Sequence, residues 1–334
     1  MKRRLFVASS VAATLALAPA VRAFAQSTAD VPTPNPRPDL APVTVLYAGS
    51  LVDVMEHRVA SGVASVGLRF LGEGKGSLAL AREIESGLRP ADVFISADTK
   101  VLDGLGPSAR KNVVTWYATF AATRLVLGYA RSSPFAKLFA DVARGKAPLT
   151  AAFTASNLRI GRTDPTLDPK GYRSILAMRL LELDGTLPSG FAARVLGDPR
   201  NPSQILPEET LLTRLETGDV DLAFLYATES VARGLPKIEL PKTANLGDPA
   251  EAATYAKASL TIGEVTHTGS PATYAVALPA GGADPAGAQT FVTWLLGEPG
   301  RAALTAAGVD VLKPVFSGDR AAVPPNLRAV VGAR

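Results

Sequence analysis

Short apolar strands that alternate with loops and helices most constrain what this chain can fold into. Three strands are predicted at residues 43–47, 66–71 and 92–96, and helices at residues 51–59 and 78–84. A cycle of strand, loop and helix this short is typical of a parallel sheet in an α/β domain. We therefore predict an α/β fold, and the 334 residues are enough for one or two domains.

The same pattern continues toward the C-terminus, without an internal repeat. We expect further strands at residues 125–129, 222–226 and 273–278, and helices at residues 135–144, 175–183, 206–217, 229–233, 291–296 and 301–307.

The N-terminal segment resembles an export leader followed by a spacer. A basic start at residues 2–4 precedes an apolar stretch at residues 7–20 and a small-residue cleavage site. We predict a signal peptide at residues 1–25, twin-arginine-like with an ordinary Sec signal as the alternative, and a proline-rich linker at residues 26–42. The apolar stretch is too short to span a bilayer comfortably, so we expect a periplasmic protein without stable membrane insertion.

Most of the net charge belongs to this leader. The whole chain carries +5, and four basic residues with no acidic residue precede Gln26. Removing these four charges leaves the mature protein at +1. The high isoelectric point therefore gives no support for binding nucleic acid or anionic lipid.

The numbers of cysteine and histidine residues exclude or disfavour several kinds of catalytic and metal-binding site. The chain has no cysteine, which excludes thiol catalysis, iron–sulfur clusters and cysteine-bound zinc. Its two histidines, His57 and His267, lie outside the candidate loops described below. A histidine-rich metal site and a Ser-His-Asp nucleophile are both disfavoured.

Two of the loops that follow predicted strands combine glycine with serine. Gly49-Ser50 follows the first strand and Gly76-Ser77 follows the second. Glycine allows the backbone to approach a ligand, and a serine hydroxyl at a helix start can donate to an anion or simply cap the helix. The spacing at residues 72–77 fits neither a phosphate-binding P-loop nor a dinucleotide fingerprint.

A third loop, at residues 161–173, contains two Asp-Pro steps. A residue before proline is pushed out of the helical region, so the two steps should bar helix up to Pro169, and the helix should begin abruptly with the residues from Gly171 onward. Such a start offers free N–H groups, here at Gly171 and Tyr172, to an anion. Asp164 and Asp168 could form a carboxylate pair for acid–base work or could shape turns.

Three other side chains each have two possible roles. Tyr226 ends a buried strand, and its hydroxyl either reaches a ligand or bonds a backbone carbonyl. Arg162 and Arg173 either supply positive charge to a ligand or are structural.

Taken together, these pieces resemble the extracellular solute-binding proteins of ABC importers, and among them the archaeal-type tungstate/molybdate-binding proteins. The resemblance runs from about residue 43 to residue 315. It is carried by the segments 47–51, 76–77, 91–98, 218–224, 238–241 and 245–249, and most specifically by the Asp-Pro-x-x-Asp-Pro-x-Gly-Tyr-Arg string at residues 164–173.

The resemblance implies a two-lobed periplasmic-binding fold of type II with a hinged ligand cleft. Lobe 1 would comprise residues 43–125 plus 270–334, and lobe 2 residues 126–269. An oxyanion would bind in the cleft between them. The residues expected to contact it are Gly49, Ser50, Gly76, Ser77, Asp168, Gly171, Tyr172, Tyr226 and Glu229.

In some members of the family, two carboxylates also coordinate the molybdenum or tungsten atom of the bound oxyanion, without a free metal ion, and the resemblance implies the same here. Asp168 is the expected first carboxylate. Where the family pattern places a glutamate, this chain has Leu225, so either Glu229 reaches back or the second carboxylate is missing. Lys170 stands where many relatives have cysteine, and we interpret that difference as neutral for binding.

The resemblance predicts a monomeric, metal-oxyanion-binding protein that captures molybdate or tungstate and delivers it to an ABC-transporter permease, without a cofactor or a catalysed reaction. One alternative is a binding protein for sulfate, phosphate, a chelated metal or a small organic anion. Another is an exported hydrolase that uses one of the aspartates with Ser50 or Ser77. Neither serine lies in a G-x-S-x-G elbow, which disfavours the hydrolase.

Overall fold

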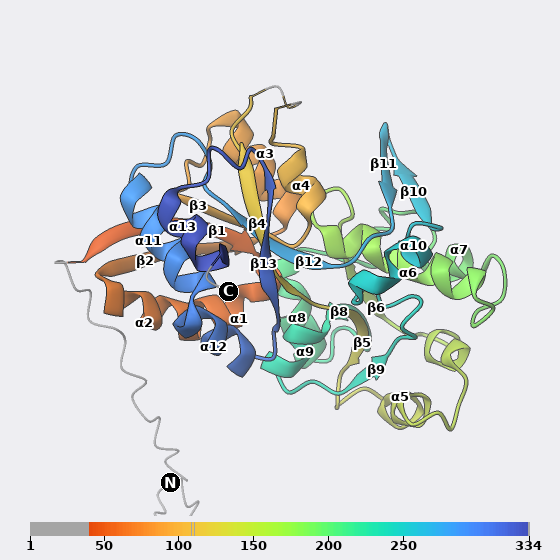
Figure 1. Cartoon of the computed structure of the whole chain (residues 1–334). Coiled ribbons are helices and arrows are strands. Elements are labelled where there is room, and N and C mark those ends of the chain that lie inside the picture. The colour runs from red at the N-terminus through yellow and green to blue at the C-terminus, as the bar shows by residue number, and fades with distance from the viewer. Residues whose placement is uncertain (1–39, 108, 110, 333–334) are drawn as a thin grey trace, which may run out of the picture. The chain divides into compact units, whose positions relative to one another are not determined.

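A six-stranded mixed sheet organises the first group of elements (Figure 1). Its strand order is β13-β4-β12-β3-β1-β2. β1 pairs in parallel with β2 and β3, whereas β12 runs antiparallel to β3 and β4. The strands are β1 (Ala41–Ala48), β2 (Leu68–Lys75), β3 (Val93–Ser96), β4 (Trp116–Ala122), β12 (Thr273–Ala277) and β13 (Asp310–Gly318).

The computed structural model describes residues 40–107, 109 and 111–332, which belong to one compact unit, Pro38–Arg334. The predicted signal peptide and most of the predicted linker lie outside the described residues. Within the described ranges, no helix is long and apolar enough to cross a membrane.

Helices follow the strands of the first sheet. After β1 the chain forms consecutive helical turns, and after β2 it forms a regular helix. These elements are η1 (Gly49–Leu51), α1 (Val52–Val54), η2 (Met55–Val59), α2 (Ala60–Val63), η3 (Ala64–Val66), α3 (Ser77–Ser86) and α4 (Thr99–Asp103), with α11 (Pro285–Leu296), α12 (Glu298–Ala306) and α13 (Pro325–Gly332) near the C-terminus.

A five-stranded mixed sheet, in the order β7-β6-β8-β5-β9, organises the middle of the chain. β6 is parallel to β7 and β8, and β5 is antiparallel to β8 and β9. The strands are β5 (Leu125–Tyr129), β6 (Ile160–Thr163), β7 (Ile205–Leu206), β8 (Leu222–Tyr226) and β9 (Lys237–Glu239).

The remaining elements accompany this second sheet in sequence. Strands β10 and β11 pair with each other as a hairpin. The elements are α5 (Ala136–Ala143), η4 (Leu149–Phe153), α6 (Pro169–Leu183), α7 (Phe191–Leu196), α8 (Glu208–Glu216), α9 (Ala227–Ala232), η5 (Pro249–Glu251), α10 (Ala252–Tyr255), β10 (Ser259–Ile262) and β11 (Val265–Thr268).

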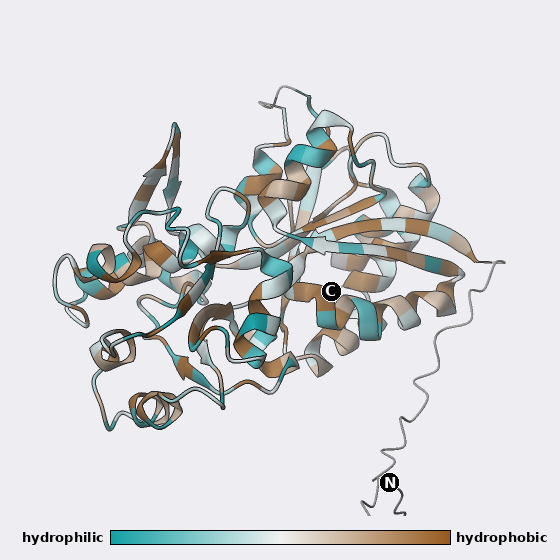
Figure 2. Cartoon of the chain, turned by 180° about the vertical axis from the view of Figure 1, so that it is seen from behind, coloured by the Kyte–Doolittle hydropathy of each residue, from teal (hydrophilic) through white to brown (hydrophobic). Residues whose placement is uncertain are grey.

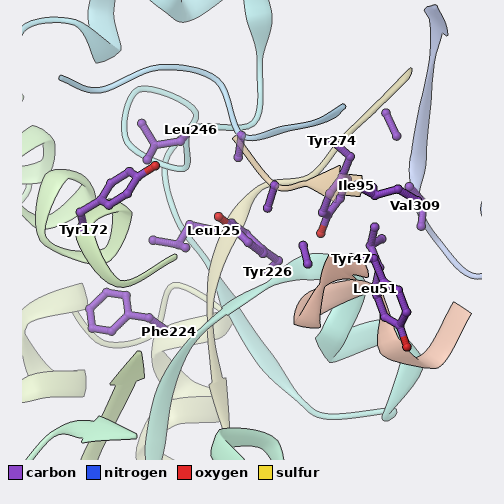
Figure 3. Packing of buried hydrophobic residues seen from close by; sticks show 14 of the residues in the cluster. Tyr47, Leu51, Ile95, Leu125, Tyr172, Phe224, Tyr226, Leu246, Tyr274 and Val309 are labelled. Atoms are coloured by element: carbon purple, nitrogen blue, oxygen red, sulfur yellow. The ribbon is translucent and has the colours of Figure 1, made fainter. Parts of the chain in front are cut away.

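The chain passes between the two sheets twice, from β4 to β5 and back before β12. The two passages are bonded to each other, because the Thr123 N–H donates to the carbonyl of Ala272 at 2.9 Å. One buried hydrophobic cluster includes residues of both sheets, among them Tyr47, Phe224 and Tyr274 (Figure 3). The exact division into two lobes stays a prediction.

The α/β class is confirmed, and hydrophobic residues concentrate along the strands of the first sheet (Figure 2). The parallel pairing predicted from the first three strands is confirmed for β1, β2 and β3, whereas strands from later in the chain add antiparallel pairs to both sheets. The predicted loop at residues 72–77 is also wrong in part, since β2 extends to Lys75. The predicted helix at 206–217 begins only at Glu208, because Ile205–Leu206 pairs with β6 as a strand.

Candidate functional site

Asp168 caps the start of α6, the helix that follows the third candidate loop. Pro169 occupies the first helical turn, where its missing N–H costs nothing. The Asp168 Oδ1 atom accepts from the Lys170 N–H at 3.0 Å, and the Asp168 carbonyl accepts from the Gly171 N–H at 3.0 Å. The helix start is therefore capped by its own residue, contrary to the expectation of free N–H groups. The contacts of Gly171 and Tyr172 with a ligand stay predictions.

Gly171 also has a packing reason to be glycine. A Cβ atom there would lie 2.6 Å from the Thr163 carbonyl oxygen and 2.6 Å from the Pro165 nitrogen. The first turn of α6 thus packs directly onto the end of β6, and only glycine fits.

The second oxygen of Asp168 stands apart from this cap. The residue is only 3 % exposed, and Oδ2 has no hydrogen-bond partner among the described residues. Asp164 differs, because its Oδ1 accepts from both the N–H and the hydroxyl of Thr166, at 2.8 and 2.7 Å. Asp164 is a turn residue, whereas Asp168 keeps a buried carboxylate oxygen available.

The segment that carries Asp168 packs against the start of α3. The Ala79 N–H donates to the Leu167 carbonyl at 3.1 Å. A Cβ atom on Gly76 would lie 2.4 Å from that carbonyl oxygen and 3.2 Å from the Asp168 Cβ atom. Glycine at 76 therefore permits this approach. A cleft of about 270 Å³ is lined here by residues that include Gly76, Asp168 and Glu208.

The two candidate serines are buried and each accepts one hydrogen bond. Ser77 Oγ accepts from the Ala97 N–H at 3.1 Å. Ser50 Oγ accepts from the Tyr274 hydroxyl at 3.1 Å, and Thr228 lies 3.4 Å from the same hydroxyl. Each serine keeps its own hydroxyl proton for another acceptor. The cleft described above brings Gly76 and Asp168 together but is not lined by either serine.

A buried ion cluster lies beside this cleft, and sequence reasoning missed two of its members. The Lys170 ammonium lies 2.6 Å from Glu229 Oε1 and 3.2 Å from Glu208 Oε1. Glu229 Oε2 accepts from the Tyr226 N–H at 2.7 Å, which completes the cap of α9. Both Glu229 oxygens are thus engaged within the chain, and its predicted contact with a ligand stays a prediction. From the sequence, Lys170 is expected to have no effect on ligand binding, but its charged ammonium group binds two buried carboxylates.

Glu208 also reaches the first candidate loop. Its Oε2 atom accepts from the Gly49 N–H at 3.2 Å, so the glycine predicted to donate to an oxyanion here donates to a carboxylate. Burial, and next the charge of Asp168, raise the pKa of Glu208 to about 8 against the opposing pull of Lys170. Burial lowers the pKa of Lys170, but Glu229, Glu208 and Asp168 outweigh it and hold that pKa well above its usual value.

Arg173 connects the second sheet's helix α6 to the end of β3. Its Nη1 donates to the Ala97 carbonyl at 2.6 Å and to the Tyr226 hydroxyl at 2.7 Å, and its Nη2 lies 3.0 Å from Asp98 Oδ2. The Tyr172 hydroxyl donates to the same Asp98 oxygen at 2.5 Å. All these side chains are buried, so Arg173 is a structural arginine, and Tyr226 bonds it rather than a backbone carbonyl.

The other predicted cation, Arg162, is also structural. Its side chain is fully buried and bonds the Gln204 side chain and the carbonyls of Asp198 and Pro199.

Neither histidine forms a nucleophilic triad. The His267 ring stacks on Tyr172 at 4.1 Å between centroids, and exposed His57 lies 3.9 Å from Asp53. Among the described residues, no cluster of three or more His, Cys, Asp or Glu side chains could hold a metal ion. The arrangement combines buried hydroxyl donors, one available carboxylate oxygen and contacts that join two sheets, which suits the capture of a small solute.

Residues 43–310 match the family model described as bacterial extracellular solute-binding protein. The chain belongs to this family. It is therefore a binding protein by family, and the resemblance drawn from its sequence is confirmed.

Relatives of this solute-binding protein include named oxyanion binders. A putative ABC transporter molybdenum-binding protein of Haloferax volcanii is 34 % identical over 70 % of this chain and 71 % of the relative. The molybdate/tungstate-binding protein WtpA of Thermococcus kodakarensis is 27 % identical over 80 % of this chain and 79 % of the relative.

Solved structures show the same fold. The periplasmic molybdate-binding protein of Azotobacter vinelandii aligns with a TM-score of 0.53 and 18 % identity, over 80 % of this chain and 98 % of the other. The sulfate-binding protein SubI of Mycobacterium tuberculosis aligns with a TM-score of 0.50 and 15 % identity, over 88 % and 90 %. The expected type II periplasmic-binding fold is thereby confirmed.

Proposed function

We propose that this protein captures molybdate or tungstate in the periplasm and delivers it to the permease of an ABC importer. The relatives that are named as molybdenum- or molybdate/tungstate-binding proteins support this choice of solute. A leader at residues 1–25 would bring the protein to that compartment.

The observation that carries the proposal is the buried, unpartnered Oδ2 atom of Asp168, beside Gly76 and the start of α3. A lone carboxylate that faces an anion is repulsive unless the anion carries a proton or its central atom accepts another oxygen ligand. Molybdenum and tungsten can accept such a ligand, whereas the sulfur of sulfate cannot. Asp168 therefore favours a metal oxyanion over sulfate.

The other donors fit an oxyanion held largely by neutral groups. Ser50 and Ser77 each have a hydroxyl proton to give, and both lie at the starts of helical turns. Gly49 and Gly76 would let backbone N–H groups approach the oxygens. We propose Asp168 as the carboxylate that touches the metal atom.

Calorimetric titration of the mature protein with molybdate, tungstate, sulfate and phosphate tests this function. We expect tight binding of molybdate or tungstate and weak binding of sulfate. Asp168→Asn keeps the helix cap, because asparagine caps as well as aspartate. It should weaken molybdate binding by more than about tenfold, which corresponds to about 1.4 kcal/mol.

The matched control is Asp141→Asn, which removes a surface carboxylate that pairs with Lys137 and Arg144. This variant should bind molybdate as the unmodified protein does. Tight sulfate binding without molybdate or tungstate binding would refute the proposal. Unchanged molybdate affinity in Asp168→Asn would reduce Asp168 to a capping residue.

A further inference from the structure

Glu208 is a buried carboxylate outside the predicted site that accepts a hydrogen bond from one of the predicted donors. It begins α8, its side chain is 4 % exposed, and it lines the same cleft as Asp168. One of its oxygens already accepts from the Gly49 N–H, a donor proposed for the oxyanion. Its neighbour Glu209 is exposed, as an ordinary acidic residue in a first helical turn would be.

The charge of this cluster is unsuited to a dianion when every group is ionised. Three buried carboxylates, Asp168, Glu208 and Glu229, surround one ammonium group, that of Lys170. Their sum is −2, and a bound molybdate would add two further negative charges. Buried like charges cost several kcal/mol, so the cluster favours taking up a proton when an anion enters.

We propose that Glu208 is a further residue of the ligand site and binds the oxyanion only as a neutral carboxylic acid, so that a proton is taken up with the anion wherever Glu208 is ionised beforehand. This inference rests on the proposed function. The proton comes from water and adds to a Glu208 oxygen, and the resulting O–H donates to an oxygen of the anion. No other bond forms or breaks.

Glu208 is the group of the cluster placed to take this proton. Its bond to Lys170 is the longer of the two, at 3.2 Å against 2.6 Å for Glu229, and the second Glu229 oxygen is held by the Tyr226 N–H. The pKa of Glu208 is raised to about 8, so the group is largely protonated at neutral pH.

Groups from several elements face Glu208 or line its cleft. The groups that face it or line its cleft are Lys170 and Asp168 at the start of α6, Glu229 on α9, the Gly49 N–H on η1, Lys75 on β2, Asp164 after β6 and exposed Glu209 on α8 itself. Lys75 is paired with Glu83 at 2.6 Å and Asp164 with Arg200 at 3.3 Å. Lys170 holds its proton throughout the neutral range, and burial lowers the pKa of His267, away from pH 8.

Titrations with molybdate between about pH 6.5 and pH 9.5 test this inference. If the anion binds only with the proton, affinity is flat below pH 8 and falls about tenfold per pH unit above it. Titration in two buffers of different ionisation enthalpy should show uptake of about one proton per anion at pH 9 and almost none at pH 6.5. This second measurement uses the unmodified protein and needs no variant.

Glu208→Gln supplies a neutral side chain of the same shape, and its molybdate affinity should not change over this pH range. At pH 9 it should therefore bind about tenfold more tightly than the unmodified protein. The control Glu216→Gln removes an exposed carboxylate at the far end of α8 and should keep the original pH profile.

Each outcome of these titrations either supports or overturns the role of Glu208. A flat profile in the unmodified protein, no proton uptake at pH 9, or an unchanged slope in Glu208→Gln overturns the role of Glu208 and leaves molybdate binding intact. A Glu208→Gln variant that only loses stability, with the slope retained, assigns Glu208 to holding Lys170. Absence of oxyanion binding at every pH overturns the proposed function together with this inference.

Discussion

Replacing Lys170 with methionine should destabilise the folded protein strongly. The ammonium holds Glu229 at 2.6 Å and Glu208 at 3.2 Å, and all three side chains are at most 4 % exposed. Removing one partner of a buried ion pair costs about 3–5 kcal/mol, because the other charge is left uncompensated. At about 2 °C per kcal/mol for a chain of this size, the melting temperature should fall by roughly 6–10 °C.

The loss should also depend on pH, with a definite sign. The folded-state pKa of Lys170 is raised, so its contribution to stability is fully present below the unfolded pKa near 10.4 and is lost only at higher pH. Without Lys170, buried Glu208 loses the charge that favours its ionised form. Its pKa, already raised to about 8, then rises further, so Lys170→Met should lose additional stability relative to the unmodified protein as the pH rises above about 8.

Urea unfolding at pH 6, pH 8 and pH 9.5 measures both effects. Lys137→Met is the matched control, because Lys137 is 90 % exposed and pairs with Asp141 on the surface, where such pairs contribute at most about 1 kcal/mol. A Lys170→Met variant within about 1 kcal/mol of the unmodified protein at pH 8 would refute the buried-pair reasoning. A stability difference that is the same at pH 6 and pH 9.5 would refute the assignment of the pH dependence to Glu208.

Two further predictions concern a glycine that lines the cleft and a buried aspartate that pairs with Arg173. Gly76→Ala should weaken molybdate binding by about tenfold or more, because its Cβ atom would meet the Leu167 carbonyl at 2.4 Å. Gly104→Ala, where a Cβ atom would have no neighbour closer than 3.4 Å, should leave the affinity unchanged in the same titration, and equal affinities in the two variants would contradict this prediction. Asp98→Asn should lower the free energy of unfolding by about 3 kcal/mol, measured by urea unfolding at pH 7, because it leaves buried Arg173 without its carboxylate; a loss below about 1 kcal/mol would contradict it.

The strands that could be predicted from the sequence are those with continuous apolar runs. Strands β1, β3, β5, β8 and β12 lie where the runs indicate, because full burial on both faces leaves a local signal. Strands β4 and β13 were missed. Their antiparallel pairing joins segments almost 200 residues apart, which no local pattern encodes.

The candidate site also combines features that adjacent residues predict with contacts between distant residues that no local pattern predicts. The abrupt start of α6 beside the second Asp-Pro step was predicted from a few adjacent residues, but the helix begins at Pro169 itself and its cap by Asp168 was not predicted. Lys170 and Glu208 could not be recognised, because the lysine meets partners 38 and 59 residues away. An isolated lysine in a sequence is ordinarily exposed, and only the tertiary structure shows this one to be buried.

The bonds from Arg173 and Tyr172 to the end of β3 have a kinetic consequence. They are made by protein groups alone, so they hold the two sheets' loops together whether or not an anion is present. Under the proposed function, a solute held between the two sheets leaves only when the sheets separate, and that separation must break several of these buried bonds at once. The residence time of the solute would then be set partly by contacts that never touch it, and the permease of the proposed function would have to supply interactions that compensate for their loss.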